Sequence, residues 1–330
     1  MLLLAAMALL GMWSCDDSGG REVENPAPSV YYWRSTYALT EGQKAWMKHE
    51  GIRKMYLHMF DITMRDGLSM PVATVSFKDS LPQGVEVIPT VFVEEPVVRN
   101  EENIDTLAAR IVERVQKMAR ANGFRYRELQ MDCDWTSTSQ ERYYELLRLI
   151  AKADTSVTLS ATVRLHQLQM APPPVSYGAL MLYNTGDFRK ANSDRNPILD
   201  QRDVEPYLRY LRKYPLPLCA AYPNYKWQLL FAGEEFKGIL YDQDLNDSTL
   251  YAATPRSEGQ RSDYQEYSVV GSRTIYMSLG ANPLHLIPGE KVKVWSVDKA
   301  SRDTVRQMVE KYRPGINKQI ITYHLSAIKD

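Results

Sequence analysis

The regular alternation of strand-like and helix-like segments constrains the fold of this chain more than any other feature. Segments rich in β-branched and aromatic residues are predicted strands, and they cover residues 29–37, 53–62, 85–95, 127–135, 156–167, 177–186, 215–225 and 317–326. Segments with apolar residues at helical spacing are predicted helices, and they cover residues 41–50, 103–123, 138–153, 203–214 and 301–315. Seven steps from strand to helix favour an α/β fold, a (β/α)8 TIM-like barrel, over residues 29–330.

Residues 226–297 interrupt this alternation with strand pairs that are typical of hairpins. We therefore predict a β-rich insertion late in the barrel. A doubly wound open sheet is the alternative fold. Such a sheet usually carries a glycine-rich phosphate loop after its first strand, and this sequence has none there.

Residues 1–14 are apolar and stand directly before Cys15. They are too few to cross a bilayer, which takes about 20 residues, but they fit a signal peptide. The arrangement resembles the lipobox of bacterial lipoproteins, which implies a palmitate-bearing lipid anchor at Cys15 and a place in the cell envelope, on the outer membrane. Residues 15–28 form a polar, flexible tether. An N-terminal transmembrane stub or a cytoplasmic start is the alternative.

Charge and cysteine usage exclude several classes of function. The chain has 40 Lys+Arg and 40 Asp+Glu, whereas a nucleic-acid-binding protein usually shows a basic excess, so no nucleic-acid partner is expected. Cys133 and Cys219 each lie in an apolar run and are predicted to be free, buried thiols. Neither has a neighbour at metal-ligand spacing, and we expect no metal and no cofactor.

Side chains of a strand alternate between its two faces, so the apolar set on one face identifies the polar set on the other. In the segment "LQMDCDW", the residues Gln130, Asp132 and Asp134 share one face, which we assign to the barrel interior. The same reasoning applied to the other strands assigns to the interior Tyr32, Arg34, Tyr56, His58, Phe60, Ile88, Thr90, Phe92, Glu94, Ser160, Thr162, Arg164, His166, Tyr222, Asn224 and His324.

Enzymes with this fold work at the C-terminal ends of the barrel strands. Polar and aromatic residues gather there, and aromatic rings stack on sugars as readily as they fill cores. We therefore predict a carbohydrate ligand. The predicted ligand-binding residues are Trp33, Arg34, Trp135, Arg164, His166, Tyr183, Asn184, Tyr222, Asn224 and His324.

The stretch "LQMDCDWT" resembles the fourth barrel strand of family 18, chitinase-like glycoside hydrolases, whose motif reads DxxDxDxE. Asp132 and Asp134 match its second and third aspartates, and "MLYN" resembles the sixth-strand motif MxYD. Leu129, Thr136 and Asn184 replace the first aspartate, the acid glutamate and the MxYD aspartate. The whole chain resembles an uncharacterised family of bacterial TIM-barrel lipoproteins. The resemblance implies a fold but not the family 18 mechanism, because a threonine hydroxyl is too weak an acid to protonate a glycosidic oxygen.

Two hypotheses follow. In the first, the chain is a glycoside hydrolase with Glu94 as acid/base, Asp134 as nucleophile and Asp132 in support. Neighbouring strands lie about 4.8 Å apart, which suits the roughly 5–5.5 Å of a retaining carboxylate pair. In the second, it is a non-catalytic glycan-binding or structural protein whose acids pair internally with Arg34 or Arg164. The bonding partners of the carboxylates distinguish the two.

Overall fold

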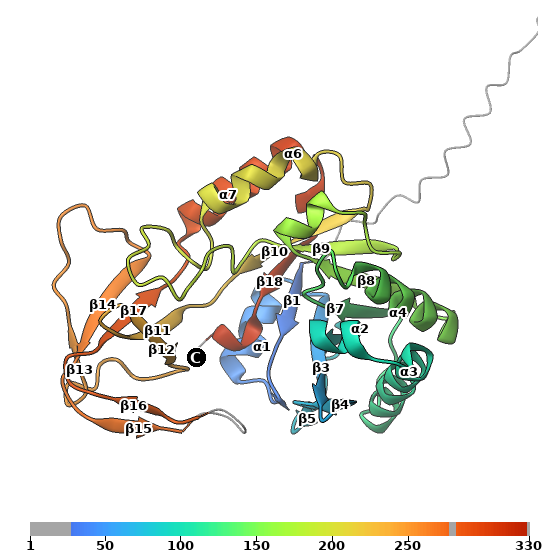
Figure 1. Cartoon of the computed structure of the whole chain (residues 1–330), viewed down its shortest axis with the longest axis horizontal. Helices are drawn as coiled ribbons and strands as arrows, with labels where there is room; N and C mark the ends of the chain where they lie inside the picture. Colours follow the sequence, from blue (N-terminus) through green and yellow to red (C-terminus); the bar gives the residue numbers. More distant parts are fainter. Residues whose placement is uncertain (1–27, 277–281, 329–330) are drawn as a thin grey trace, which may run out of the picture.

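The computed structural model describes residues 28–276 and 282–328 and shows a closed barrel of eight parallel strands (Figure 1). These strands are β1 (Ser29–Tyr32), β3 (Lys54–Arg65), β6 (Glu86–Val93), β7 (Glu128–Asp132), β8 (Thr158–Val163), β9 (Tyr177–Met181), β10 (Leu218–Pro223) and β18 (Ile320–Tyr323). Strand β1 pairs with both β3 and β18, which closes the barrel. The predicted barrel and its eight strands are confirmed.

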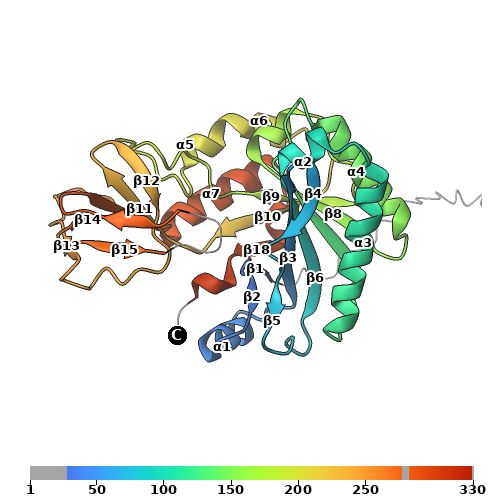
Figure 2. The same ribbon diagram turned by 60° about the horizontal axis from the view of Figure 1, so that its bottom comes forward.

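Helices pack around the outside of this barrel (Figure 2). They are α1 (Glu41–His49), α2 (Glu95–Asn100), α3 (Ile104–Ala121), α4 (Gln140–Ala153), α5 (Gln201–Val204), α6 (Leu208–Leu211) and α7 (Lys299–Tyr312). The buried residues of α3 fall at the spacing of three and four that predicted this helix. Helix α2 was not predicted. In the part of the chain that the structure describes, no helix is long and apolar enough to cross a membrane.

The predicted alternation of strand and helix is wrong at two of the connections between barrel strands. Residues 66–85, between β3 and β6, form β4 (Leu68–Val72), β5 (Ser76–Phe77) and loops, and β5 pairs with β2 (Thr36–Tyr37). The connection from β8 to β9 carries only a short 3-10 helix, Leu165–Gln169. The barrel therefore lacks an outer helix directly after β3.

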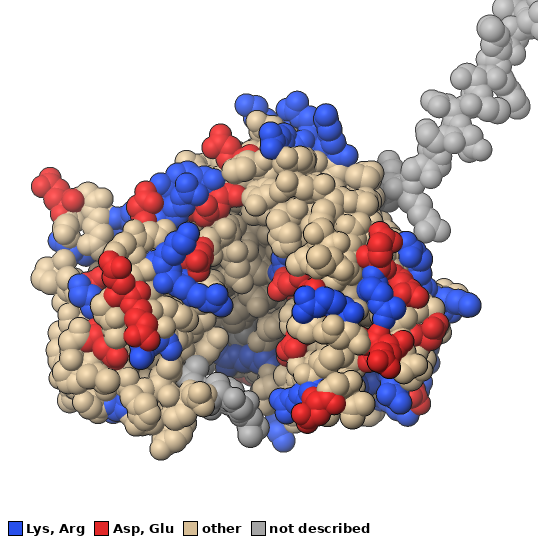
Figure 3. Space-filling model, in the orientation of Figure 1, with Lys and Arg blue, Asp and Glu red and all other residues tan. Residues whose placement is uncertain are grey.

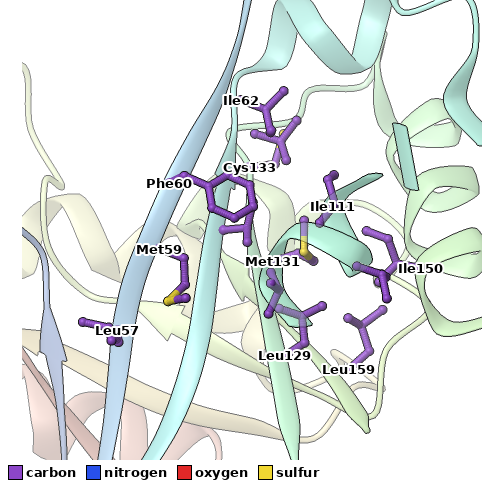
Figure 4. Close-up of a cluster of buried hydrophobic side chains, with 14 of the residues drawn as sticks. Leu57, Met59, Phe60, Ile62, Ile111, Leu129, Met131, Cys133, Ile150 and Leu159 are labelled. Carbon is purple, nitrogen blue, oxygen red and sulfur yellow. The ribbon is translucent and has the colours of Figure 1, made fainter. Parts of the chain in front are cut away.

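A β-bulge in β3 changes which residues face the barrel interior. His58 aligns with Thr90 of β6, but Phe60 aligns with Val91, so the register shifts by one residue between them. Phe60, predicted to face inward, turns outward instead, where the Arg114 guanidinium of α3 lies 5.1 Å from its ring centre. Figure 4 shows Phe60 in the apolar cluster that also contains Ile111 of α3.

The predicted orientation is also wrong for Tyr32 and Tyr222. Tyr31 faces the interior and donates a hydrogen bond to Gln130 Oε1 at 2.7 Å, whereas the Tyr32 hydroxyl donates to Thr36 O at 2.8 Å outside the barrel. Tyr222 packs on the outer side and donates to Asn317 Oδ1 at 2.7 Å. Strands β1 and β10 are buried on both faces, so their sequences carry no alternation that identifies the inner one.

The predicted β-rich insertion follows β10. A five-stranded antiparallel sheet has the order β12-β11-β17-β14-β13, and β15 and β16 form a separate pair. The bounds are β11 (Trp227–Ala232), β12 (Glu235–Ile239), β13 (Tyr251–Ala253), β14 (Tyr264–Val269), β15 (Arg273–Ile275), β16 (Leu284–Leu286) and β17 (Lys291–Trp295). The molecular surface is hollowed between this insertion and the barrel (Figure 3).

Candidate functional site

An arginine bridges the two aspartates that end β7. Arg164 follows β8, and its Nη2 donates to Asp132 Oδ1 at 3.3 Å while its Nε donates to Asp134 Oδ1. Thr162 Oγ1 also donates to Asp132 Oδ1. The side chain of Asp132 is 5% exposed, that of Arg164 20% and that of Asp134 55%, so the cluster extends from the barrel interior to its mouth.

The electrostatics of this cluster follow from burial. Burial raises the pKa of Asp132, an effect that the positive charge of Arg164 opposes and the negative charge of Asp134 reinforces. Burial also acts to lower the pKa of Arg164, but the two carboxylates outweigh it and raise that pKa above its usual value. Arg164 therefore stays charged, and it holds two carboxylates in an ion cluster at the place where a hydrolase would need free ones.

A second polar pair lies on β3. His58 Nε2 and Asp61 Oδ1 are 2.6 Å apart, and the Trp33 ring centre lies 4.6 Å from the His58 ring centre. Asp61 aligns with Phe92 of β6 because of the bulge, and its charge acts on Asp132. Simple alternation sends Asp61 outward, so sequence reasoning missed it. The only available signal was a carboxylate three residues after His58 in an otherwise apolar strand.

Aromatic rings line the mouth beside these clusters. Tyr183 and Tyr323 stack with ring centres 4.3 Å apart and an interplanar angle of 11°. Trp33 lies 6.1 Å from the Tyr323 ring centre, and Tyr225 lies 5.7 Å from it on another side. Tyr225 donates a hydrogen bond to Asn184 Oδ1. Tyr323 was not among the predicted ligand-binding residues, because the alternation assigned to the last strand selected His324.

Glu94 does not pair with Asp134. It is the residue before α2, and its Oε2 accepts a hydrogen bond from Thr63 Oγ1 of β3 at 2.6 Å. Strand β6 lies between β3 and β7 in the sheet, so this bond directs the Glu94 carboxylate away from β7. The distance argument for a retaining pair assumed that both carboxylates point toward each other, whereas Glu94 accepts from Thr63 and Asp134 accepts from Arg164.

Three predicted ligand-binding residues lie away from the interior of the mouth. The predicted contact of Trp135 with a ligand is wrong, because the side chain is fully buried against Tyr143 and Tyr144 of α4. Tyr222 is covered on the outer side of β10, as described above. His166 lies exposed on the 3-10 helix after Arg164, because β8 ends at Val163.

The remaining predicted residues sit at the rim. Arg34 Nη2 forms an ion pair with Asp242 Oδ2 at 3.4 Å, which joins the barrel to the insertion. The His324 ring stacks on Tyr225 with centres 5.8 Å apart. Asn224 donates its backbone N–H to Tyr323 O and lines a small outer groove with Arg302.

Thr136 is part of a turn that starts α4. Its backbone N–H donates to Ser139 Oγ at 3.0 Å, and its Oγ1 lies 2.9 Å from Thr138 Oγ1. The side chain is thus one member of a hydroxyl cluster at a helix start. The position after Trp135 that would present an acid in the family 18 motif serves here to shape this turn.

Thiols and carboxylates do not converge on a metal site. Cys133 and Cys219 are free and buried, and burial raises the pKa of Cys219 to about 12. Within residues 28–276 and 282–328, no three His, Cys, Asp or Glu side chains are grouped so as to hold a metal ion. Cys15, the predicted lipidation site, lies outside the described residues.

Comparison with known proteins gives the fold and little more. No family model and no curated protein matches the sequence. Solved structures of chitinase-like barrels do match, at low identity. A chitinase-like agglutinin from Robinia pseudoacacia is 10% identical with a TM-score of 0.51, covering 92% of this chain and 96% of its own. The C-terminal domain of a Desulfitobacterium hafniense protein is 9% identical with a TM-score of 0.51, covering 93% and 95%.

A family 18 chitinase from Cycas revoluta, solved with (GlcNAc)3, is 12% identical with a TM-score of 0.48, covering 91% of this chain and 95% of its own. The two structures with a TM-score of 0.51 establish a shared barrel architecture and, at such low identity, the fold alone. The architectural part of the predicted resemblance is therefore confirmed. The relation to bacterial TIM-barrel lipoproteins stays a prediction.

Replacing Arg164 by Met should leave Asp132 buried without its cation. Removing one partner of a buried ion pair costs about 3–5 kcal/mol, so we expect a loss of this size in the free energy of unfolding at pH 7. The pKa of Asp132 is raised, so the residue takes up a proton on acidification and the loss should shrink as the pH falls. Urea unfolding at several pH values measures this.

Two variants control that experiment. Arg164→Met combined with Asp132→Asn should recover most of the loss, because the uncompensated charge is gone. Arg34→Met, at an ion pair whose side chains are about half exposed, should cost no more than about 1 kcal/mol. Equal losses for Arg164→Met and Arg34→Met would contradict the role given to Arg164.

The stability of the fold should depend on pH through His324. Burial, together with the positive charge of Arg34, lowers the pKa of His324 from 6.5 to about 4. The folded state therefore disfavours protonation of the ring. The free energy of unfolding is highest above pH 6.5, where the ring is neutral in both the folded and the unfolded state, and it falls as the pH drops toward 4. We expect the free energy of unfolding to drop by up to about 3 kcal/mol across that window, and His324→Gln to remove this part of the drop. Urea unfolding measures this free energy at each pH. The role of His324 would be ruled out if the free energy of unfolding of His324→Gln fell with pH as steeply as that of the unchanged protein.

Proposed function

We propose that this protein binds carbohydrate at the C-terminal end of its barrel without hydrolysing it. The observation that carries the proposal is the bridging of Asp132 and Asp134 by Arg164. A catalytic carboxylate must accept or donate a proton or attack a sugar carbon, and the oxygens that Arg164 bonds, Asp132 Oδ1 and Asp134 Oδ1, are occupied by that contact. This geometry favours recognition over catalysis.

The proton donor of a hydrolase is the second consideration. General acid catalysis contributes roughly 100- to 10,000-fold to such reactions. Thr136 stands at the position of the family 18 acid, and we propose that the chain lacks that catalytic glutamate. The alternative donor, Glu94, is bonded to Thr63 and directed away from β7. One of the similar structures is named a chitinase-like agglutinin, a name that refers to agglutination, and it supports the proposal.

The aromatic side chains at the barrel mouth would provide the surface on which a sugar ring stacks. Trp33, Tyr225 and Tyr323 are each partly exposed, and the Trp33 ring centre lies 4.6 Å from that of His58, the partner of Asp61. Flat aromatic faces beside polar groups suit the apolar faces and hydroxyls of a pyranose ring. We assign Trp33, Asp61, Asp134 and Tyr323 to ligand contact.

A binding and hydrolysis assay on the same oligosaccharides tests the proposal. Isothermal titration against neutral oligosaccharides, N-acetylglucosamine oligomers included, should show saturable binding, with no new reducing ends after long incubation. Trp33→Ala should weaken binding by about 10- to 100-fold, the value of burying one large apolar side chain. Tyr210→Ala, on the outer helix α6, should bind like the unchanged protein.

Release of reducing ends would overturn the proposal in favour of a glycoside hydrolase. In that case Glu94→Gln should abolish turnover while leaving the unfolding midpoint unchanged, if Glu94 is the acid. Absence of binding to every oligosaccharide would point instead to a structural role for the barrel.

We further propose that the protein is a lipoprotein of the cell envelope, anchored in the outer membrane through Cys15. The apolar residues 1–14 directly before a cysteine support this, as does the polar tether 15–28 that would separate barrel from membrane. Expression in a Gram-negative host with radiolabelled palmitate should label the protein and leave it in the membrane fraction. Cys15→Ser should lose the label and become extractable. Label that persists in Cys15→Ser would disprove the assignment, and Cys133→Ser serves as the matched control.

A further inference from the structure

A groove on the outer wall of the barrel has a cavity volume of about 1090 Å³. Its floor is formed by Phe60, Ile62 and Met64 of β3, one wall by α3 and the other by β4. None of the residues that line it belongs to the candidate site at the barrel mouth. The groove is thus a separate feature, and it goes beyond the proposed function.

The groove exists because an outer helix is missing. In a (β/α)8 barrel, the helix that joins two successive strands covers them from outside. Residues 66–85 form short strands and loops in its place, and the bulge in β3 turns Phe60 toward this uncovered side. Phe60 and Ile62 stay buried at the bottom of this groove, and its apolar rim opens to solvent at Leu68, which is 66% exposed. Apolar area that is left exposed in this way commonly marks a binding site.

Hydrogen bonds close the groove at both ends. At one end, Ser69 Oγ donates to the Glu101 carboxylate, and at the other Arg114 Nη2 donates to Thr74 Oγ1 at 2.9 Å. Between these contacts α3 advances ten residues, from Ile104 to Arg114, or about 15 Å at 1.5 Å per residue. A space of this length with closed ends suits a small flexible molecule better than a helix or strand of a partner protein.

The end near Arg114 is suited to an anion. The Arg114 guanidinium lies over the Phe60 ring, and its Nε is buried with no hydrogen-bond partner in the described chain. Arg110, one helical turn earlier, lines the same groove. The nearby carboxylate of Glu113 is paired with Lys117 at 2.6 Å. Among the described residues no carboxylate forms an ion pair with Arg110 or Arg114, so an anionic oxygen placed between their guanidinium groups would gain charge-assisted hydrogen bonds.

We propose that this groove binds a free amphipathic carboxylate of the fatty-acid class. The carboxylate binds the guanidinium groups of Arg110 and Arg114, and the flexible alkyl chain lies along Met64 and Met70 toward Leu68. Methionine side chains, present here as Met64, Met70 and Met118, adapt to chains of differing shape. The volume of about 1090 Å³ slightly exceeds the roughly 300–1,000 Å³ of typical small-molecule sites, so the groove has room for an alkyl chain.

Isothermal titration with dodecanoate below its micellar concentration tests the inference. We expect saturable one-to-one binding that is at least about 10-fold tighter than that of dodecyltrimethylammonium, because only the carboxylate accepts from Arg114. Arg114→Gln should weaken dodecanoate binding by about 10-fold, the value of one charge-assisted hydrogen bond. Arg114 also bonds Thr74, so a second variant that leaves the wall intact is needed.

Leu68→Asp is this second variant. Leu68 is exposed, and its replacement adds a negative charge on the path of the alkyl chain. It should abolish dodecanoate binding, whereas Ile287→Asp, at a comparably exposed apolar residue on the insertion, should leave it unchanged. Oligosaccharide binding should be the same in both variants. No saturable dodecanoate binding, equal binding of the ammonium detergent, or full binding by Leu68→Asp would each overturn the inference.

Discussion

Asp132 is a carboxylate almost wholly enclosed by a closed barrel, and its burial is tolerated only because Arg164 faces it from the next strand. The position of Arg164 is fixed in turn by Gln167. The Gln167 Oε1 accepts from the Arg164 backbone N–H at 2.8 Å, while its Nε2 donates to Trp135 O at 3.0 Å. Gln167 therefore ties the segment after β8 to the segment after β7, and the buried Trp135 anchors both to α4. Ion cluster, connecting loop and outer helix support one another.

This arrangement bears directly on chemistry. A barrel that uses its fourth strand for acid catalysis must leave at least one carboxyl able to exchange a proton with a ligand. Here the guanidinium occupies the space between Asp132 and Asp134, and Glu94 is bonded on the far side of β6. The polar groups that still face solvent are the exposed part of Asp134 and the His58–Asp61 pair, set among aromatic rings. Such a set suits the recognition of hydroxyl-bearing ligands that we propose, with little chemical demand on any one group.

The amino-acid sequence was sufficient for the barrel, because period-two and period-3.6 patterns survive in every long element, as α3 illustrates. It was also sufficient to bring together Asp132, the last residue of β7, and Asp134 and Arg164, which follow β7 and β8. It was not sufficient for Tyr31 against Tyr32, because β1 is buried on both sides and carries no alternation. Trp135 was assigned to the ligand as an aromatic residue at a strand end, although alternation with Leu129, Met131 and Cys133 places it on the outer side, where the structure buries it against α4. The strand register determines which way a side chain points. This register depends on the pairing with neighbouring strands, which the sequence of one strand does not give.

The bulge in β3 shifts the register by one residue, and this shift affects side chains on both faces of the barrel wall. With regular pairing, Phe60 would fill the barrel interior and Asp61 would face the helices. The extra residue reverses both: it brings Asp61 to His58 at the mouth and places Phe60 beneath Arg114 on the outer wall. The polar pair of the candidate site and the floor of the outer groove thus have one structural cause. Because bulges re-aim side chains without changing the fold, a barrel can acquire new surfaces on both sides of a strand while its closure is maintained.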